Sequence, residues 1–243
     1  APDGRKMSKS WGNTITPDEI ISEGYGADAI RVMELFIGPW NQKANWSVEG
    51  MGGCYRFLQR IWTLTQEYQD SAETETIEAL EVALLKSTHQ TTHKVSKDIA
   101  ELGFNTAIAA LMEHVNELYK LKSEYGFADK QQWGVTIAIL LQLLAPFAPH
   151  ITDELWEQLG KTESIHASDW PTHDDKYLVS DVMTIAIQVN GKLRGELETA
   201  SDSSQDAIVA AAQADAKVAS HLTGKTIRKT IYVPGKIVNF VAN

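Results

Sequence analysis

The spacing of apolar residues changes once along this chain, and that change limits the fold more than any other feature. Up to about residue 160, apolar residues recur every three or four positions, as from Val48 to Trp62, which is the spacing of an amphipathic helix. From Met183 to Val189 they alternate with polar or small residues, which is typical of a half-buried strand. The sequence therefore predicts a mainly α-helical bundle followed by a small α+β domain.

Helix and turn signals divide the chain into four segments. In residues 1–46, Thr16 and Pro17 begin a helix as N-cap and first helical residue, and a second helix follows from about Asp28. Residues 47–160 form the bundle, with about five helices and Ser47 as the first N-cap. Residues 161–181 have no sustained periodicity and are predicted to be a linker. Residues 182–243 form the C-terminal domain.

The C-terminal domain is predicted to have the order ββαββ. Asn190-Gly191 is a strong hairpin signal between the first two strands. A single helix follows from Ser203 and ends before Gly224. The last two strands, Ile227–Val233 and Ile237–Val241, flank a Pro-Gly turn.

Length and composition describe an ordinary globular protein. The chain has 243 residues, 43% of them hydrophobic, and no run of 18 or more apolar residues that could span a membrane. Its first residues do not form a secretory signal. Cys54 is the single cysteine, so no internal disulfide is possible and a reducing cytoplasm fits.

The stretch from Gly4 to Asn13, GRKMSKSWGN, holds the main candidate site. Lys6 and Lys9 stand three positions apart and alternate with serines, between Gly4 and Gly12. A short basic loop with glycines at its edges can close over phosphate, whose charge a flexible ammonium group follows. The alternative is a solvated basic turn near the chain terminus.

A second candidate site is the basic face of the C-terminal domain. The chain carries a formal charge of −10, yet residues 183–243 hold seven Lys or Arg against five Asp or Glu, which gives +2 and leaves −12 for the rest. Its candidate RNA-contacting residues are Lys192, Arg194, Lys225, Arg228, Lys229 and Lys236. Lysines that protect sheet edges from pairing are the equally good alternative.

Metal binding is not expected. His89 and His93 have helical i, i+4 spacing, but no third ligand is near in the sequence, and Gln90 stands where a metalloprotease has Glu. These histidines are expected to be exposed or stacked.

The run Lys6-Met7-Ser8-Lys9-Ser10, with Gly12-Asn13 after it, resembles the KMSKS signature of class I aminoacyl-tRNA synthetases. The resemblance implies that these five residues bind ATP and that the loop closes over it. Lys9 would be the main catalytic contact to the departing pyrophosphate, and Lys6 the secondary one. Mg²⁺ would accompany ATP in the intact enzyme.

Further runs resemble the leucyl-tRNA synthetase family. They are the segments from Phe104 to Met112, Pro146 to Ile151, Val189 to Arg194, and Ile227 to Lys236. Valyl and isoleucyl relatives share the loop and the bundle and remain alternatives. The resemblance implies an anticodon-binding helical domain and a tail that grips the outer corner of tRNA. Leucine, ATP and leucine-accepting tRNA are the implied partners of a monomer.

The other half of class I chemistry is not visible in this sequence. None of its seven histidines forms His-x-Gly-His, and a strand-rich nucleotide-binding half is missing. We therefore expect a C-terminal part of a longer enzyme that is inactive alone. A freestanding, non-catalytic RNA-binding module is the alternative.

Overall fold

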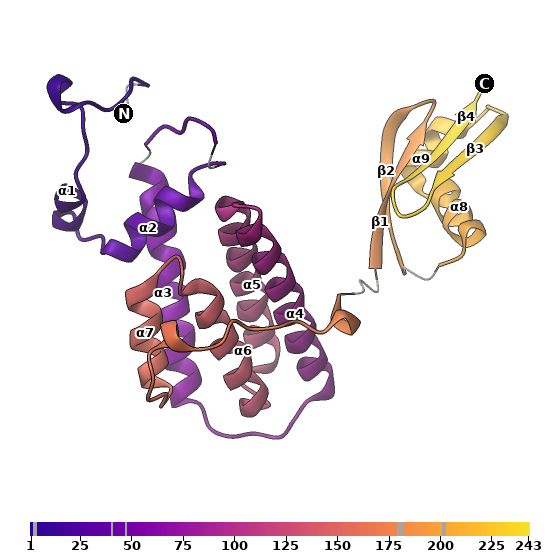
Figure 1. Cartoon of the computed structure of the whole chain (residues 1–243). Helices are drawn as coiled ribbons and strands as arrows, with labels where there is room; N and C mark the ends of the chain where they lie inside the picture. Colours follow the sequence, from indigo (N-terminus) through magenta and orange to yellow (C-terminus); the bar gives the residue numbers. More distant parts are fainter. Residues whose placement is uncertain (2–3, 40, 47, 179–181, 201–202) are drawn as a thin grey trace. The chain divides into compact units, whose positions relative to one another are not determined.

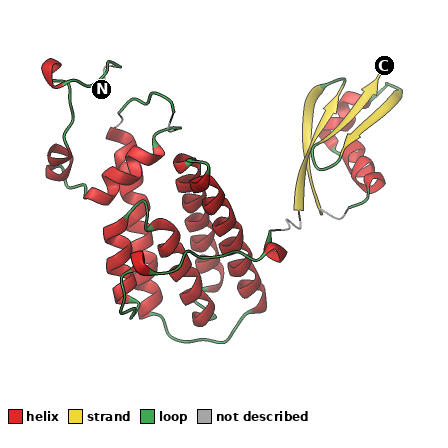
Figure 2. Cartoon of the chain, viewed as in Figure 1, coloured by secondary structure: helices red, strands yellow, loops and turns green. Residues whose placement is uncertain are grey.

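The computed structural model describes residues 1, 4–39, 41–46, 48–178, 182–200 and 203–243 (Figure 1). The chain divides into two units, residues 1–178 and 179–243, and each is described by itself. The first is helical and the second contains the sheet, as predicted for the fold class (Figure 2). Within the described ranges, no helix combines the length and apolarity needed to cross a membrane.

The first unit begins with the candidate loop and two helices. A short 3-10 turn, η1 (Lys9–Trp11), is followed by α1 (Pro17–Ser22) and α2 (Ala27–Phe36). Thr16 starts α1 as predicted: its hydroxyl accepts from the amide of Glu19, and the Glu19 carboxylate accepts from the amide of Thr16. This reciprocal cap satisfies two amides that a helix start leaves unpaired.

Five helices form the bundle in the described part of residues 48–158. They are α3 (Val48–Asp70), α4 (Glu78–Ala100), α5 (Phe104–Tyr125), α6 (Lys130–Leu144) and α7 (Pro149–Gln158). Helix α6 is central, with Trp133, Ile137 and Leu140 fully buried, because its sequence is apolar on nearly every side. The predicted cap at Ser47 lies outside the described residues.

The segment predicted to be a linker packs on the bundle as far as Leu178. It contains η2 (Ile165–Ala167) and η3 (Asp175–Tyr177), and Ile165 is buried in the helical core. Trp170 Nε1 donates to Ser96 Oγ on α4 over 2.8 Å. This part of the chain therefore belongs to the first unit.

The second unit is a four-stranded sheet with two helices. Its strands are β1 (Val182–Val189), β2 (Lys192–Ala200), β3 (Ile227–Val233) and β4 (Ile237–Ala242), in the order β2-β1-β4-β3. The pairs β1–β2 and β3–β4 are antiparallel hairpins, whereas β1 and β4 pair in parallel. The two outer strands are thus β2 and β3.

The single helix predicted in this unit is wrong, because the structure has α8 (Gln205–Ala214) and α9 (Ala216–Leu222). Asp215 separates them with an extended ψ of 128°, and its carboxylate accepts from the amides of Lys217 and Val218. The side chain therefore caps a new helix instead of continuing the old one.

Each outer strand contains a β-bulge, and each bulge inserts an arginine. Arg194 lies between Leu193, opposite Gln188, and Gly195, opposite Ile187. In the same way, Arg228 is the extra residue on β3 against β4. A bulge interrupts the alternation of side chains along a strand. Lys192 and Arg194 are two positions apart, but the bulge breaks the alternation that would place them on one face of a regular strand.

Candidate functional site

The candidate loop presents both lysines to solvent. Lys6 and Lys9 are exposed, and neither has an ion pair or side-chain hydrogen bond within the described part of the chain. Ser8 Oγ and Ser10 Oγ are hydrogen-bonded to each other at 2.8 Å, and Met7 is half-buried. The two ammonium groups are therefore available to an anion.

Asn13 closes the loop from its far end. The amide of Ser8 donates to Asn13 Oδ1 over 2.8 Å, and Asn13 Nδ2 donates to the carbonyl of Lys6 over 3.3 Å. Gly12 makes this return possible with a left-handed φ of 63°, which glycine adopts without steric cost. The sequence contained Asn13 next to the signature, but the pattern alone gave no role to its side chain.

The loop forms one wall of a cavity of about 550 Å³. Lys6 and Met7 line it on one side, and Glu34 on α2, Lys43 and Trp46 line it elsewhere. Lys43 is exposed and adds a positive charge to a cavity that Arg5 and Lys6 also line. The sequence analysis did not single out Lys43, because the residue lies more than thirty positions from the signature and meets it only in the fold.

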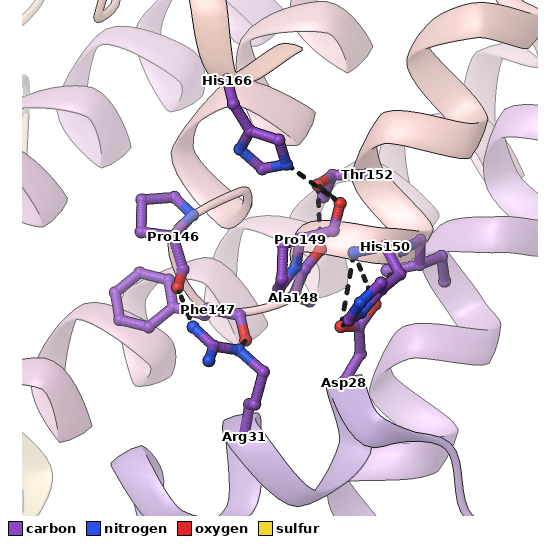
Figure 3. A network of polar contacts seen from close by, with 10 residues as sticks. Asp28, Arg31, Pro146, Phe147, Ala148, Pro149, His150, Thr152 and His166 are labelled. Atoms are coloured by element: carbon purple, nitrogen blue, oxygen red, sulfur yellow. Dashed lines mark hydrogen bonds and ion pairs between the residues drawn. The ribbon is translucent and has the colours of Figure 1, made fainter. Parts of the chain in front are cut away.

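Helix α2 joins the loop segment to the bundle by a polar clamp (Figure 3). The carboxylate of Asp28 accepts from the backbone amides of His150 and Ile151 at the start of α7. Arg31 donates to the carbonyls of Pro146 and Phe147, just after α6. Acids favour a helix start and bases favour a helix end because of the helix dipole. The clamp thus fixes α2 against the α6–α7 corner.

In the second unit, the fold gathers four of the six predicted RNA contacts. The side-chain amide of Asn190 donates to the carbonyl of Ala242 and accepts from the backbone amide of Ala242. These two bonds bring the start of β2 beside the end of β4. Ala242 in turn lies opposite Ile227 at the start of β3. We call the cations gathered there the basic end; they are Lys192, Lys225, Arg228 and Lys229, all exposed.

The other two predicted contacts lie elsewhere. Lys236 is in the β3–β4 turn at the opposite end of the sheet, where its carbonyl accepts from the amide of Ala186. Arg194 is half-buried, and its Nε has no hydrogen-bond partner among the described residues. The structure therefore does not bring Lys236 into the basic end.

The two histidines on α4 pack against the segment before Leu178. His89 stacks on Tyr177 with ring planes 2° apart, and its Nδ1 accepts from the amide of Asp174. Burial lowers the pKa of His89, and Asp174 opposes that shift. His93 Nδ1 lies 3.1 Å from His173 Nε2, a neighbour the sequence did not reveal. Even so, no group of three or more His, Cys, Asp or Glu in the described ranges could hold a metal ion.

Two family models match the chain. One, described as the anticodon-binding domain of tRNA ligase, matches residues 81–209, and one for class I tRNA synthetases (I, L, M and V) matches residues 1–47. The first match covers more than half of the chain. The chain therefore belongs to the anticodon-binding domain family of class I tRNA ligases.

Curated proteins similar to this chain include leucine–tRNA ligases. The relative from Herpetosiphon aurantiacus is 42% identical over 243 residues, and that from Dehalococcoides mccartyi strain CBDB1 is 45% identical over 238 residues. Each match covers 98% of this chain and 29% of the relative. The chain thus spans less than a third of these proteins. The relatives favour leucine over the valyl and isoleucyl alternatives.

Two solved structures share the fold of this chain. The Agrobacterium radiobacter K84 LeuRS–tRNA–LeuAMS complex matches with a TM-score of 0.75 and 29% identity, covering 100% of this chain and 31% of that one. Methionyl-tRNA synthetase from Mycobacterium tuberculosis matches with a TM-score of 0.51 and 20% identity over 65% of this chain and 36% of that one, which supports a shared fold alone.

Proposed function

We propose that this chain is the part of a leucine–tRNA ligase that carries the ATP-closing loop and holds tRNA. One observation carries the proposal: Lys6 and Lys9 are exposed, and their ammonium groups have no partner among the residues that the structure describes. They stand on a loop whose backbone Asn13 fixes. The relatives of the chain supply the amino acid and the reaction class.

In the proposed reaction, the leucine carboxylate attacks the α-phosphate of ATP, which gives leucyl-adenylate and pyrophosphate. Leucine then passes to the 3′ end of tRNA. Negative charge develops on the leaving pyrophosphate, and a positioned cation stabilises it most in the transition state. Lys9 supplies the main contact and Lys6 the second, while Met7, Ser8 and Ser10 shape the ATP-binding loop. We assign no Mg²⁺ ligand to this chain.

Binding of tRNA is the second part of the proposal. The basic end suits phosphate contacts, which position RNA without reading its sequence. Such contacts fit recognition of tRNA by its shape. We further propose that the protein acts as a monomer in the cytoplasm, where aminoacylation supplies translation.

Leucine-dependent pyrophosphate exchange tests the catalytic part. In the leucine–tRNA ligase that contains this chain, Lys9→Ala should lower the exchange rate by about 10²-fold, the cost of removing one transition-state donor. Lys6→Ala should lower it less. Lys97→Ala, which removes an exposed lysine from α4, is the matched control. A Lys9→Ala enzyme with the full rate of pyrophosphate exchange would contradict the role of the loop. Pyrophosphate exchange by the isolated 243-residue chain would contradict the proposal that the chain needs a further catalytic part.

A further inference from the structure

We propose that three histidines form a pH-sensitive latch that holds residues 168–178 on helix α4. We call this segment the strap; it is the last part of the first unit, and the chain continues from it into the second unit. The histidine latch consists of His89 and His93 on α4 and His173 on the strap. It keeps the strap docked while its rings share at most one positive charge, and it releases the strap when they take up more protons. The inference goes beyond the proposed function, since it needs neither ATP nor tRNA.

Polar contacts hold the strap on the bundle. All of its residues are described, and none of them is buried. It runs along α4 against the direction of the helix (Figure 1), with Trp170 bonded to Ser96 and the carbonyl of Tyr177 accepting from Gln90 Nε2 over 3.1 Å. Segments with few buried apolar contacts open at low cost. The loss of a few hydrogen bonds therefore suffices to release the strap.

His89 must be uncharged in the docked strap. The backbone amide of Asp174 donates to His89 Nδ1 over 3.2 Å, so that nitrogen carries no proton. A charged imidazole has N–H donors at both nitrogens and would turn a donor toward this amide. Burial, the largest cause, lowers the pKa of His89, in agreement with this geometry.

His93 and His173 can carry only one positive charge between them. His93 Nδ1 and His173 Nε2 lie 3.1 Å apart, with the ring planes at 76°, so one nitrogen donates and the other accepts. If both rings were charged, two N–H donors would face each other. Asp175 Oδ1 lies 3.4 Å from His173 Nε2 and stabilises the single charge that the pair allows.

The surrounding charges do not favour further protons. The charged groups nearest the three rings are Asp174, Asp175 and Lys176 on the strap, and Lys86 and Lys97 on α4 at helical spacing from His89 and His93. Asp174 raises the pKa of His89, but Lys176 and His173 lower it, and the Asp174 carboxylate is already paired with Lys176 at 3.0 Å. In the described parts of α5 and α6, no acid has an ion pair or hydrogen bond with the rings.

These geometries set the sign of the pH dependence. An imidazole in water changes its charge between pH 5 and pH 8. At low pH the released strap lets all three rings of the histidine latch take protons, whereas the docked strap admits one. Docking is therefore strongest above about pH 6.5 and weakens as the pH falls below it. From pH 7.5 to pH 5.5 the docking equilibrium should fall roughly fiftyfold, because two protons are excluded.

Release changes the connection between the two units. While the strap is docked, the first unit holds the chain as far as Leu178. An extended chain spans about 3.3 Å per residue, so a released strap adds up to about 35 Å of chain to the connection. The histidine latch thus couples the pH to the length of this connection.

Hydrogen exchange in the full 243-residue chain tests the latch at pH 7.5 and pH 5.5. Each exchange rate is divided by the intrinsic rate of an unstructured amide at the same pH, which gives a protection factor. Protection of the Asp174 amide should fall roughly fiftyfold at the lower pH. The amide of Leu140, in the buried helix α6, should stay far more protected at both values, because the bundle remains folded.

Two variants separate protonation from packing. His89→Asn with His93→Asn keeps an uncharged acceptor near each Nδ1 position but cannot titrate, so protection at Asp174 should be equal at the two pH values. His93→Asn alone keeps the stack of His89 on Tyr177 and leaves one excluded proton, so the fall should be roughly tenfold. This single variant decides the question if the double variant has already released the strap at pH 7.5.

His221→Asn is the matched control, because it removes a histidine of the second unit; it should show the same fall as the unchanged chain. Equal protection of Asp174 at both pH values in the unchanged chain would overturn the latch, and so would an undiminished fall in the double variant. A fiftyfold fall in His93→Asn would show that the pair of His93 and His173 excludes no proton. If Leu140 loses protection down to the level of Asp174, the bundle unfolds as a whole and the latch is refuted.

Discussion

The Oδ1 atom of Asp28 lies 2.7 Å from Nδ1 of His150, although the two residues are 122 positions apart in the sequence. The same carboxylate accepts the backbone amide of His150. Because α2 follows the candidate loop and α7 belongs to the bundle, this pair ties the loop segment to the helical bundle.

Asp28→Ala should destabilise the first unit. It leaves the amides of His150 and Ile151 at the start of α7 without their charged acceptor, and we expect the free energy of unfolding to fall by about 2 kcal/mol. Asp28→Asn keeps one acceptor oxygen, so its free energy of unfolding should fall less than that of Asp28→Ala. Urea unfolding followed by tryptophan fluorescence measures both. Glu34→Ala, an exposed acid on the same helix, is the control, and an Asp28→Ala midpoint equal to that of the control would refute the clamp.

Asn13→Ala should loosen the candidate loop without unfolding the protein. Its side chain holds the amide of Ser8, so hydrogen exchange at that amide should speed up in the isolated chain. In the leucine–tRNA ligase, kcat for pyrophosphate exchange should fall while KM for leucine stays the same, because the loop acts on departing phosphate. Asn13→Asp keeps the acceptor for the Ser8 amide but loses the donor to the Lys6 carbonyl. Its hydrogen-exchange rate and its kcat should lie between those of the unchanged protein and Asn13→Ala. If Asn13→Ala leaves the rate of hydrogen exchange at the Ser8 amide unchanged, the backbone alone holds the loop.

His114 should make the stability of the first unit depend on pH. It is 2% exposed, and burial lowers its pKa from 6.5 to about 4. Between these two values the unfolded chain takes up a proton that the folded chain does not. Stability should therefore decrease as pH falls from 6.5 to 4, by up to about 1.4 kcal/mol per unit.

Urea midpoints at pH 7 and pH 5 measure this dependence. His114→Leu removes the titrating group, so its midpoint should change less between the two values. The variant also removes the partner of Ser87 Oγ, which lies 2.7 Å from His114 Nδ1, so its stability at pH 7 should be lower. An equal change with pH in both proteins would mean that other groups cause it.

Asn190 has two roles in the second unit: it adopts the left-handed turn conformation, and its side chain pairs with Ala242. Asn190→Gly should separate them. Its φ of 51° is left-handed, and glycine accepts that conformation easily. The variant therefore keeps the turn and loses only the pairing with Ala242, which we expect to cost about 1 kcal/mol. Asn190→Ala loses the pairing and also strains the turn, so it should melt at a lower temperature than Asn190→Gly. Equal melting temperatures for both variants would mean that turn strain is negligible.

Local features of the sequence were enough to predict much of the local structure, though not the break between α8 and α9. The cap formed by Thr16 and Glu19 lies within four residues, and Asn190-Gly191 needs two left-handed residues in succession. The exposed loop with Lys6 and Lys9 was equally readable as a motif. The break at Asp215 was readable in principle as a helix cap, but the apolar spacing across it suggested one continuous helix.

Long-range features could not be read from a single sequence. The contact between Asp28 and His150 depends on how the bundle folds, and so do the approach of His173 to His93 and the position of Lys43 beside the loop. The two bulges depend on cross-strand register, which side-chain alternation alone does not specify. For this reason the sequence listed six RNA contacts in one set, while the fold separates Lys236 from the basic end.

The arginines of the two bulges have a consequence for solubility. Arg194 and Arg228 sit in the outer strands β2 and β3, where unpaired backbone groups could add strands from another molecule. A strand kinked by a bulge resists such growth, and each outer strand of this sheet contains one. Deleting either extra residue should straighten its strand, and we would expect the protein to form fibrils more readily at high concentration.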